Sequence, residues 1–148
     1  MANVVPDSFK TDLLKAKFSF DTSGNSGTAF KLALYTDISG LSTSTTAYTT
    51  TNEVSSSGTS YTAGGNTLTN NGVAIASNIG YVDFADLTFS SVTLTAVGAL
   101  IYKSASPNNA VLVLDFGGSK TATNGDFVIQ FPTPVSYTHL TLPTILRV

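Results

Sequence analysis

The sequence contains no cysteine and no tryptophan, and it has one histidine, His139, and one arginine, Arg147. Without cysteine the chain forms neither disulfides nor thiolate metal sites. A Ser-His-Asp triad would have to use His139, because there is no other imidazole. Charged residues make up only 11% of the chain, and the formal net charge is −2. A chain with so few cationic side chains neutralises few phosphates, so we expect no nucleic-acid partner.

Long apolar runs are also missing. The longest, "AVGALIY" and "AVLVLDF", are far shorter than the roughly 20 residues that span a bilayer, so we expect no membrane partner. The first ten residues, "MANVVPDSFK", lack the basic region and apolar core of a signal peptide. We therefore expect a protein that is made in the cytoplasm of the producing cell.

Hydrophobic residues nevertheless reach 42%, in short clusters separated by serine, threonine, asparagine and glycine. Short strands with turn signals every 8–12 residues or so indicate an antiparallel β-sandwich or barrel-like domain, mainly β. The first strand alternates as a half-buried strand would. The long polar stretch 37–60 predicts a surface excursion or a pair of edge segments. The expected strands are 29–36, 61–69, 72–77, 80–90, 91–104, 110–116 and 127–131.

One short helix is expected near the N-terminus. Asp7 and Ser8 follow a proline, and both residue types are good N-caps. Phe9, Leu13 and Ala16 then recur at helical spacing, which predicts one apolar face.

Glycines and apolar runs make further predictions about the strands. Gly64 and Gly65 indicate a bulge or a close approach of two backbones. Gly98 predicts a kink that either bends one long strand or divides it in two. Segment 110–116, "AVLVLDF", is apolar on both faces, as a central strand would be. Segment 117–126, "GGSKTATNGD", has the composition of a loop.

Four aspartates are the candidates for catalysis. A pair among Asp83, Asp86, Asp115 and Asp126 would suit glycoside hydrolysis if two carboxylates met across a cleft. Aspartate is also common at strand ends, where it caps turns, and we favour that interpretation. "TNGD" and "LDFGG" offer oxygen ligands for calcium, but the spacing of a known calcium loop is absent. No glycine-rich loop matches a phosphate-binding motif. We expect no catalytic residue, metal or cofactor.

Exposed aromatic side chains are the candidates for binding. Tyr48, Tyr61 and Tyr81 could stack on sugars or on a partner surface, with asparagine and aspartate beside them. Tyrosine is also an ordinary strand residue, which leaves the alternative open. A carbohydrate-binding or adhesin module on a β-sandwich is therefore a second hypothesis, and a carboxylate-based hydrolase is a third.

The C-terminal stretch contains both His139 and Arg147. Its segment "VSYTHLTLPT", residues 135–144, resembles one reading frame of a transposon-based sequencing adapter. That frame continues through a variable index to a final valine and a stop, as the chain does. The resemblance implies a β-rich domain over residues 1–134 and a non-native tail over residues 135–148. The alternative is a genuine last strand, for which "TILRV" has the composition.

Four segments together resemble a family of small virion proteins from tailed bacteriophages. Each motif alone is unspecific, but their order and spacing are characteristic, and they cover most of the chain from Phe9 to Pro132. The segments are "FKLALYTD", "NEVSSSGTSYTAGGNTLTN", "DFADLTFSSVTLTAVGALIYKS" and "AVLVLDFGGSKTATNGDFVIQFP".

This resemblance implies a β-rich, non-enzymatic structural protein located in the virion. It would decorate or stabilise the capsid, or be attached to the tail. The implied partners are other virion proteins of the capsid or tail, and a homo-oligomer is a further expectation. The resemblance brings no catalytic residues. Family members look as though they continue past "QFPT" with one more apolar strand, which would be missing here.

Overall fold

The structure is a computed structural model, and it describes residues 2–22, 27–76 and 78–132. Within these ranges the chain is mainly β and antiparallel, with one short helix, as the sequence predicts. The strands do not close into a barrel. The expected tail, 135–148, lies outside the described residues. The elements are α1 (Asp7–Leu14), β1 (Phe30–Tyr35), β2 (Asn66–Leu68), β3 (Asn70–Ala76), β4 (Ile79–Phe84), β5 (Leu87–Lys103) and β6 (Ala110–Ile129).

Helix α1 forms where expected, but its capping and its apolar face differ from the prediction. Its N-cap is the preceding proline, and no side chain caps it. Asp7 lies in the first turn, where its charge suits the helix dipole. Phe9 packs on the core, but Leu13 is 44% exposed. Ala16 lies beyond the helix with a φ of +55°, so the expected face Phe9, Leu13, Ala16 is wrong.

Strand β1 lies inside a four-stranded antiparallel sheet with the order β2-β1-β5-β6. The predicted half-buried alternation is wrong, because both faces of β1 are covered. Phe30 and Leu32 belong to the main apolar cluster on one face of the sheet. Ala33 and Tyr35 belong to a second cluster on the other face. A strand between two apolar layers is buried on both sides.

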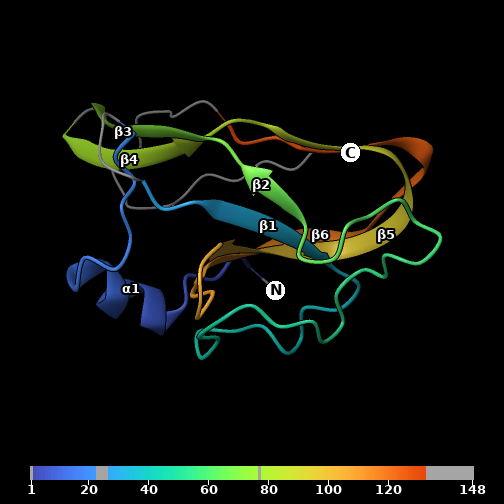
Figure 1. Cartoon of the computed structure of the whole chain (residues 1–148), viewed down its shortest axis with the longest axis horizontal. Coiled ribbons are helices and arrows are strands. Elements are labelled where there is room, and N and C mark those ends of the chain that lie inside the picture. Colours follow the sequence, from blue (N-terminus) through green and yellow to red (C-terminus); the bar gives the residue numbers. More distant parts are fainter. Residues whose placement is uncertain (1, 23–26, 77, 133–148) are drawn as a thin grey trace.

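Strands β5 and β6 form one long hairpin that curls from the lower layer into the upper layer (Figure 1). Segment 117–126, expected as a loop, lies within β6, so that prediction is wrong. The register shifts at four points along the hairpin, and such bulges increase twist and bend strands. The kink predicted at Gly98 coincides with one shift. A Cβ on Gly98 would lie 2.4 Å from the carbonyl oxygen of Leu114, so only glycine fits.

Strand β6 lies at the end of the sheet order, so the central position predicted for 110–116 is wrong. Its outer side is covered by irregular chain rather than by a strand. Val4 and Val113 exchange backbone hydrogen bonds of 2.9 and 2.8 Å. Ala110 donates to the carbonyl of Thr46 at 3.0 Å. The start of β6 is apolar on both faces because Leu114 lies in the main apolar cluster and Val113 in the second cluster.

The polar stretch after β1 contains no named strand within the described residues. We call residues 36–65 the long loop. It runs below the four-stranded sheet in Figure 1, and its Ile38 and Leu41 complete the second apolar cluster. The loop ends at Gly65, where a Cβ would lie 1.8 Å from the carbonyl oxygen of Leu32. The predicted close approach of two backbones is therefore confirmed at Gly65.

Candidate functional site

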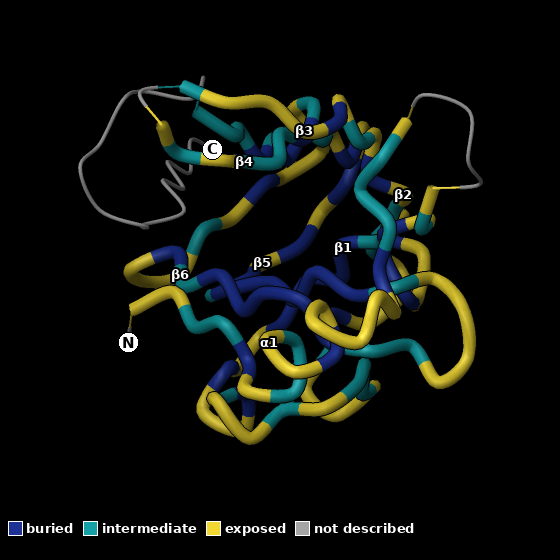
Figure 2. Tube along the Cα trace, turned by 90° about the vertical axis from the view of Figure 1, so that its left-hand side faces the viewer, coloured by how far each residue is buried: buried dark blue, intermediate teal, exposed yellow. Residues whose placement is uncertain are grey.

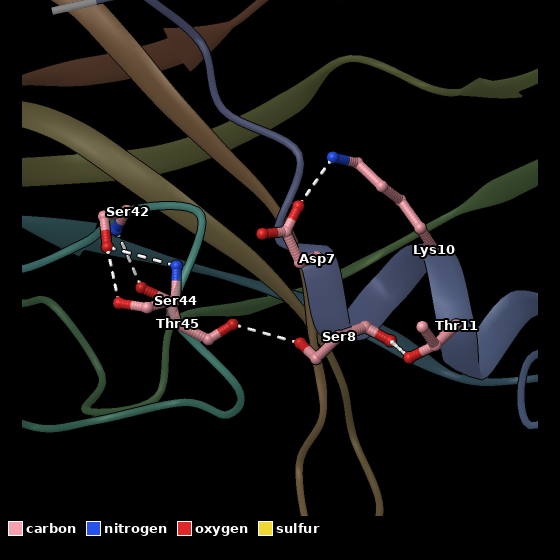
Figure 3. Close-up of polar contacts among 7 residues, drawn as sticks. All are labelled: Asp7, Ser8, Lys10, Thr11, Ser42, Ser44 and Thr45. Carbon is pink, nitrogen blue, oxygen red and sulfur yellow. Dashed lines mark hydrogen bonds and ion pairs between the residues drawn. The ribbon is translucent and has the colours of Figure 1, made fainter.

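The long loop is bound to helix α1 at Thr45 through the Ser8 hydroxyl, and neighbouring loop hydroxyls hold this turn (Figure 3). Ser8 donates to the carbonyl of Thr45 at 3.1 Å. Ser42 and Ser44 share a hydroxyl hydrogen bond of 2.8 Å, and the Thr45 hydroxyl accepts from the Ser42 N–H at 2.8 Å. The side chains of Ser42, Ser44 and Thr45 thus stabilise this turn of the long loop through local hydrogen bonds.

A second fastening is a group of tyrosines around Glu53, which we call the tyrosine–glutamate cluster (Tyr48, Glu53, Tyr61, Gly64, Tyr102). The Glu53 carboxylate accepts hydrogen bonds from the hydroxyls of Tyr48 at 2.6 Å and Tyr61 at 2.8 Å. It also accepts from the Gly64 N–H at 2.6 Å. The Tyr102 hydroxyl donates to the Gly64 carbonyl at 2.7 Å. The Glu53 carboxylate therefore joins three points of the long loop, and Tyr102 of β5 binds the end of that loop to the sheet.

This cluster also completes β1 beyond the point where β2 stops pairing with it. The Leu34 N–H donates to the Tyr61 hydroxyl at 3.0 Å, and the Leu34 carbonyl accepts from Val54 at 2.9 Å. Buried backbone groups need such partners. Burial raises the pKa of the Tyr61 hydroxyl well above its usual range, and the neighbouring Glu53 carboxylate raises it further. The hydroxyl therefore stays protonated and keeps donating.

Two of the three tyrosines predicted as surface-binding residues are committed to this cluster. Tyr61 is only 3% exposed, so its prediction as a surface aromatic is wrong. The Tyr48 ring stacks on Tyr102 with centroids 4.6 Å apart, and its hydroxyl is bound to Glu53. Sequence reasoning missed Glu53. The available signal was that it is the only glutamate in the chain.

The four candidate aspartates lie at separate points, and each binds nearby backbone or side chains. Asp83 accepts from the side chain of Asn71, and Asp115 accepts from the N–H of Gly117. The remaining two aspartates form hydrogen bonds between the two sides of the β5–β6 hairpin. Asp86 accepts from Phe131, and Asp126 accepts from Ser91.

The spacing of Asp86 and Asp126 does not suit paired hydrolytic carboxylates. Asp126 is bound to Ser91, five positions along the chain from Asp86. At about 3.3 Å per strand residue this is roughly 16 Å. Carboxylate pairs in glycosidases lie about 5–9.5 Å apart. Across the described ranges, no group of three or more metal-binding side chains converges. No helix in those ranges is long and apolar enough to cross a membrane.

The most exposed apolar surface on a strand is the two-stranded hairpin β3–β4, which we call the exposed ribbon. Its strands pair only with each other among the described residues. Val73 is 62% exposed and Ile75 is 77% exposed. In Figure 2 the ribbon lies at the top, away from the dark-blue interior around β1 and β5, and much of it is exposed. Apolar side chains held out in this way mark interaction surfaces.

The ribbon is anchored at its base, and Asp83 near the end of β4 is the one charged residue in its two strands. Phe84, at the end of β4, is buried in the main apolar cluster, and Val82 packs against that cluster. Segment 71–82, "NGVAIASNIGYV", contains no charged side chain. Tyr81 lies here opposite Ala74 and is half-buried, so it is the one predicted aromatic that the ribbon presents.

Comparisons with known proteins give no relative for this chain. No protein-family model matches it, no curated protein is similar to it, and no solved structure matches it.

Proposed function

We propose that this chain is a non-enzymatic structural protein of a tailed-bacteriophage particle, which decorates or stabilises the capsid or is attached to the tail. The observation that carries the proposal is the exposed ribbon, with Val73 62% and Ile75 77% exposed. Two large apolar side chains on one face of β3 are held in water, and a partner that covers them gains hydrophobic stabilisation. The resemblance of four segments to phage virion proteins supplies the kind of particle on which that partner is found.

The rest of the molecule supports a role as a stable building block. Loop hydroxyls, the Glu53 carboxylate and the cluster tyrosines are used to hold the long loop to the sheet. The apolar residues between the layers form one continuous cluster. A virion protein must fold alone and then bind a repeated lattice through its surface. A stably folded domain that presents the exposed ribbon suits that task.

The carbohydrate-binding alternative loses its basis in the geometry. It required Tyr48, Tyr61 and Tyr81 to form one exposed platform. Tyr61 is 3% exposed, and Tyr48 is stacked on Tyr102. Tyr81 alone remains on the ribbon, and a single tyrosine gives a sugar little surface for stacking. We therefore do not propose this function.

The proposal is tested by genomic context and by particle composition. We expect portal, capsid or tail genes beside the gene for this chain. Particles of the encoding phage, purified on a density gradient, should contain peptides from residues 30–132 when analysed by mass spectrometry. Metabolic genes on both sides, together with particles that lack these peptides, would contradict the proposal.

A further inference from the structure

We infer that the exposed ribbon is the contact through which two copies of this chain pair. The inference deepens the proposed function, on which its biological setting rests, by naming the partner of the apolar surface. It starts from the pairing of β3 with β4. Val73 lies opposite Val82, and Ile75 lies opposite Gly80, so these four residues share one face of the ribbon.

That face contains both a projection and a space. Ile75 is 77% exposed and stands above the ribbon. Its neighbour across the hairpin, Gly80, has no side chain, and a Cβ placed there would meet nothing within 4 Å. Two ribbons related by a two-fold axis can each place Ile75 over the Gly80 of the other. A two-fold contact needs this kind of self-complementary surface.

The charge distribution favours a second copy over an unlike partner. Residues on a two-fold contact face equivalent residues, so a charged patch would repel itself. The chain has a net charge of −2, but the face with Val73, Ile75, Gly80 and Val82 carries no charge, because Asp83 follows Val82 in β4 and so lies on the opposite face. A partner selected by charge complementarity would need a charged face here. The ribbon therefore offers the surface where this acidic chain can meet itself without repulsion.

The edges of the ribbon also lack the usual protection against self-association. Natural β-proteins place lysine, proline or inward-pointing charges on free edges. Segment 71–82 contains neither lysine nor proline. Among the described residues, the backbone hydrogen bonds outside the sheets include none from residues 71–84 to another part of the chain. A copy of the ribbon thus meets an apolar face with unguarded edges.

The test measures self-association of the full chain by sedimentation velocity over a concentration series. We expect wild type to show twice the 15.3 kDa mass of one chain. Ile75→Lys should raise the dissociation constant at least about tenfold, because two lysines would face an apolar contact. Gly80→Val should weaken pairing too, because it fills the space that receives Ile75. Neither change touches the core, and circular dichroism checks that each variant is folded.

Leu14→Lys is the matched control. Leu14 is 89% exposed on helix α1, so this substitution also replaces an exposed apolar side chain by lysine, but on another surface. The dissociation constant should therefore stay at the wild-type value. Gly80→Glu should also dissociate alone, but an equimolar mixture with Ile75→Lys should pair again, because the new ammonium of one copy then faces the new carboxylate of the other. Such rescue requires position 75 of one copy to meet position 80 of the other.

The inference is overturned if wild type remains monomeric up to about 100 μM, or if Leu14→Lys dissociates the pair as strongly as Ile75→Lys. Failure of the proposed function is a different result. A chain that pairs in solution but is absent from virions would leave the ribbon contact standing and reject the virion role. A monomer found on virions would do the reverse.

Discussion

Replacing Tyr61 by phenylalanine removes one oxygen atom and leaves the ring in place. That oxygen donates to Glu53 at 2.8 Å and accepts from the Leu34 N–H at 3.0 Å. Leu34 is fully buried, so its N–H would lose its partner without access to water. An orphaned buried donor costs about 1–3 kcal/mol, and a hydrogen bond to a charged group contributes about 1.5–3 kcal/mol. We expect Tyr61→Phe to lower the free energy of unfolding by about 3 kcal/mol.

Tyr48→Phe is the matched control for this change. It also removes a hydroxyl bound to Glu53, here at 2.6 Å, but no backbone group depends on that oxygen. Tyr48 and Glu53 are both partly exposed, so water can replace the lost donor. We expect a loss of about 1 kcal/mol. The two substitutions differ in what they leave unpaired and not in the atoms removed.

Guanidinium chloride unfolding, followed by circular dichroism, measures both losses at a common m-value. For a chain of this length, about 3 °C of melting temperature corresponds to each kcal/mol, so the shifts should be about 9 °C and about 3 °C. If Tyr61→Phe costs less than Tyr48→Phe, the Tyr61 hydroxyl does not complete β1. In that case the role given to the tyrosine–glutamate cluster is wrong.

Three further outcomes follow from the same structure. Gly65→Ala should prevent stable folding, because its Cβ would lie 1.8 Å from the Leu32 carbonyl oxygen at a φ of +71°. Gly40→Ala is the control: its Cβ would meet nothing within 4 Å, so its free energy of unfolding should lie within about 0.5 kcal/mol of the wild-type value. The hydrogen bond from Lys17 lowers the pKa of Asp12 from 3.8, so the ionised carboxylate stabilises the fold above that pH, and this stabilisation is lost as the pH falls below it. Asp12→Asn should therefore flatten the decline of unfolding free energy at acidic pH, and an unchanged decline would refute this assignment. Burial raises the pKa of Tyr35, Tyr48, Tyr61 and Tyr102. The free energy of unfolding should therefore decline as the pH rises through 10, where the tyrosines of the unfolded chain ionise. Absorbance at 295 nm should show that these four tyrosines ionise at higher pH in the native protein than in the unfolded protein.

Local patterns gave reliable information where a single residue decides the backbone. Gly65 and Gly98 are identifiable from their residue type alone, because a missing Cβ allows another backbone to approach closely. The helix was located to within a turn by its proline and following acidic residue. Its apolar face was misplaced, because spacing cannot show that Ala16 adopts a left-handed conformation after the helix ends.

Patterns failed where distant segments decide burial. Strand β1 alternates in sequence, yet both its faces are buried because the long loop covers the side that alternation assigns to water. Segment 117–126 has the composition of a loop, yet it forms strand because β5 provides a continuous partner. The three tyrosines looked equivalent, and only the fold separates Tyr61, inside the cluster, from Tyr81 on the ribbon.

The sequence by itself determined the class of fold, because short apolar clusters between turn residues allow few arrangements other than antiparallel strands. It also determined which chemistry is scarce, since inventory does not depend on shape. Only the tertiary structure decided which face of each strand meets water. It alone placed Glu53 between two tyrosine hydroxyls and a backbone amide, and left Ile75 exposed opposite Gly80. Burial is a property of contacts between segments far apart in the chain, and local spacing does not contain it.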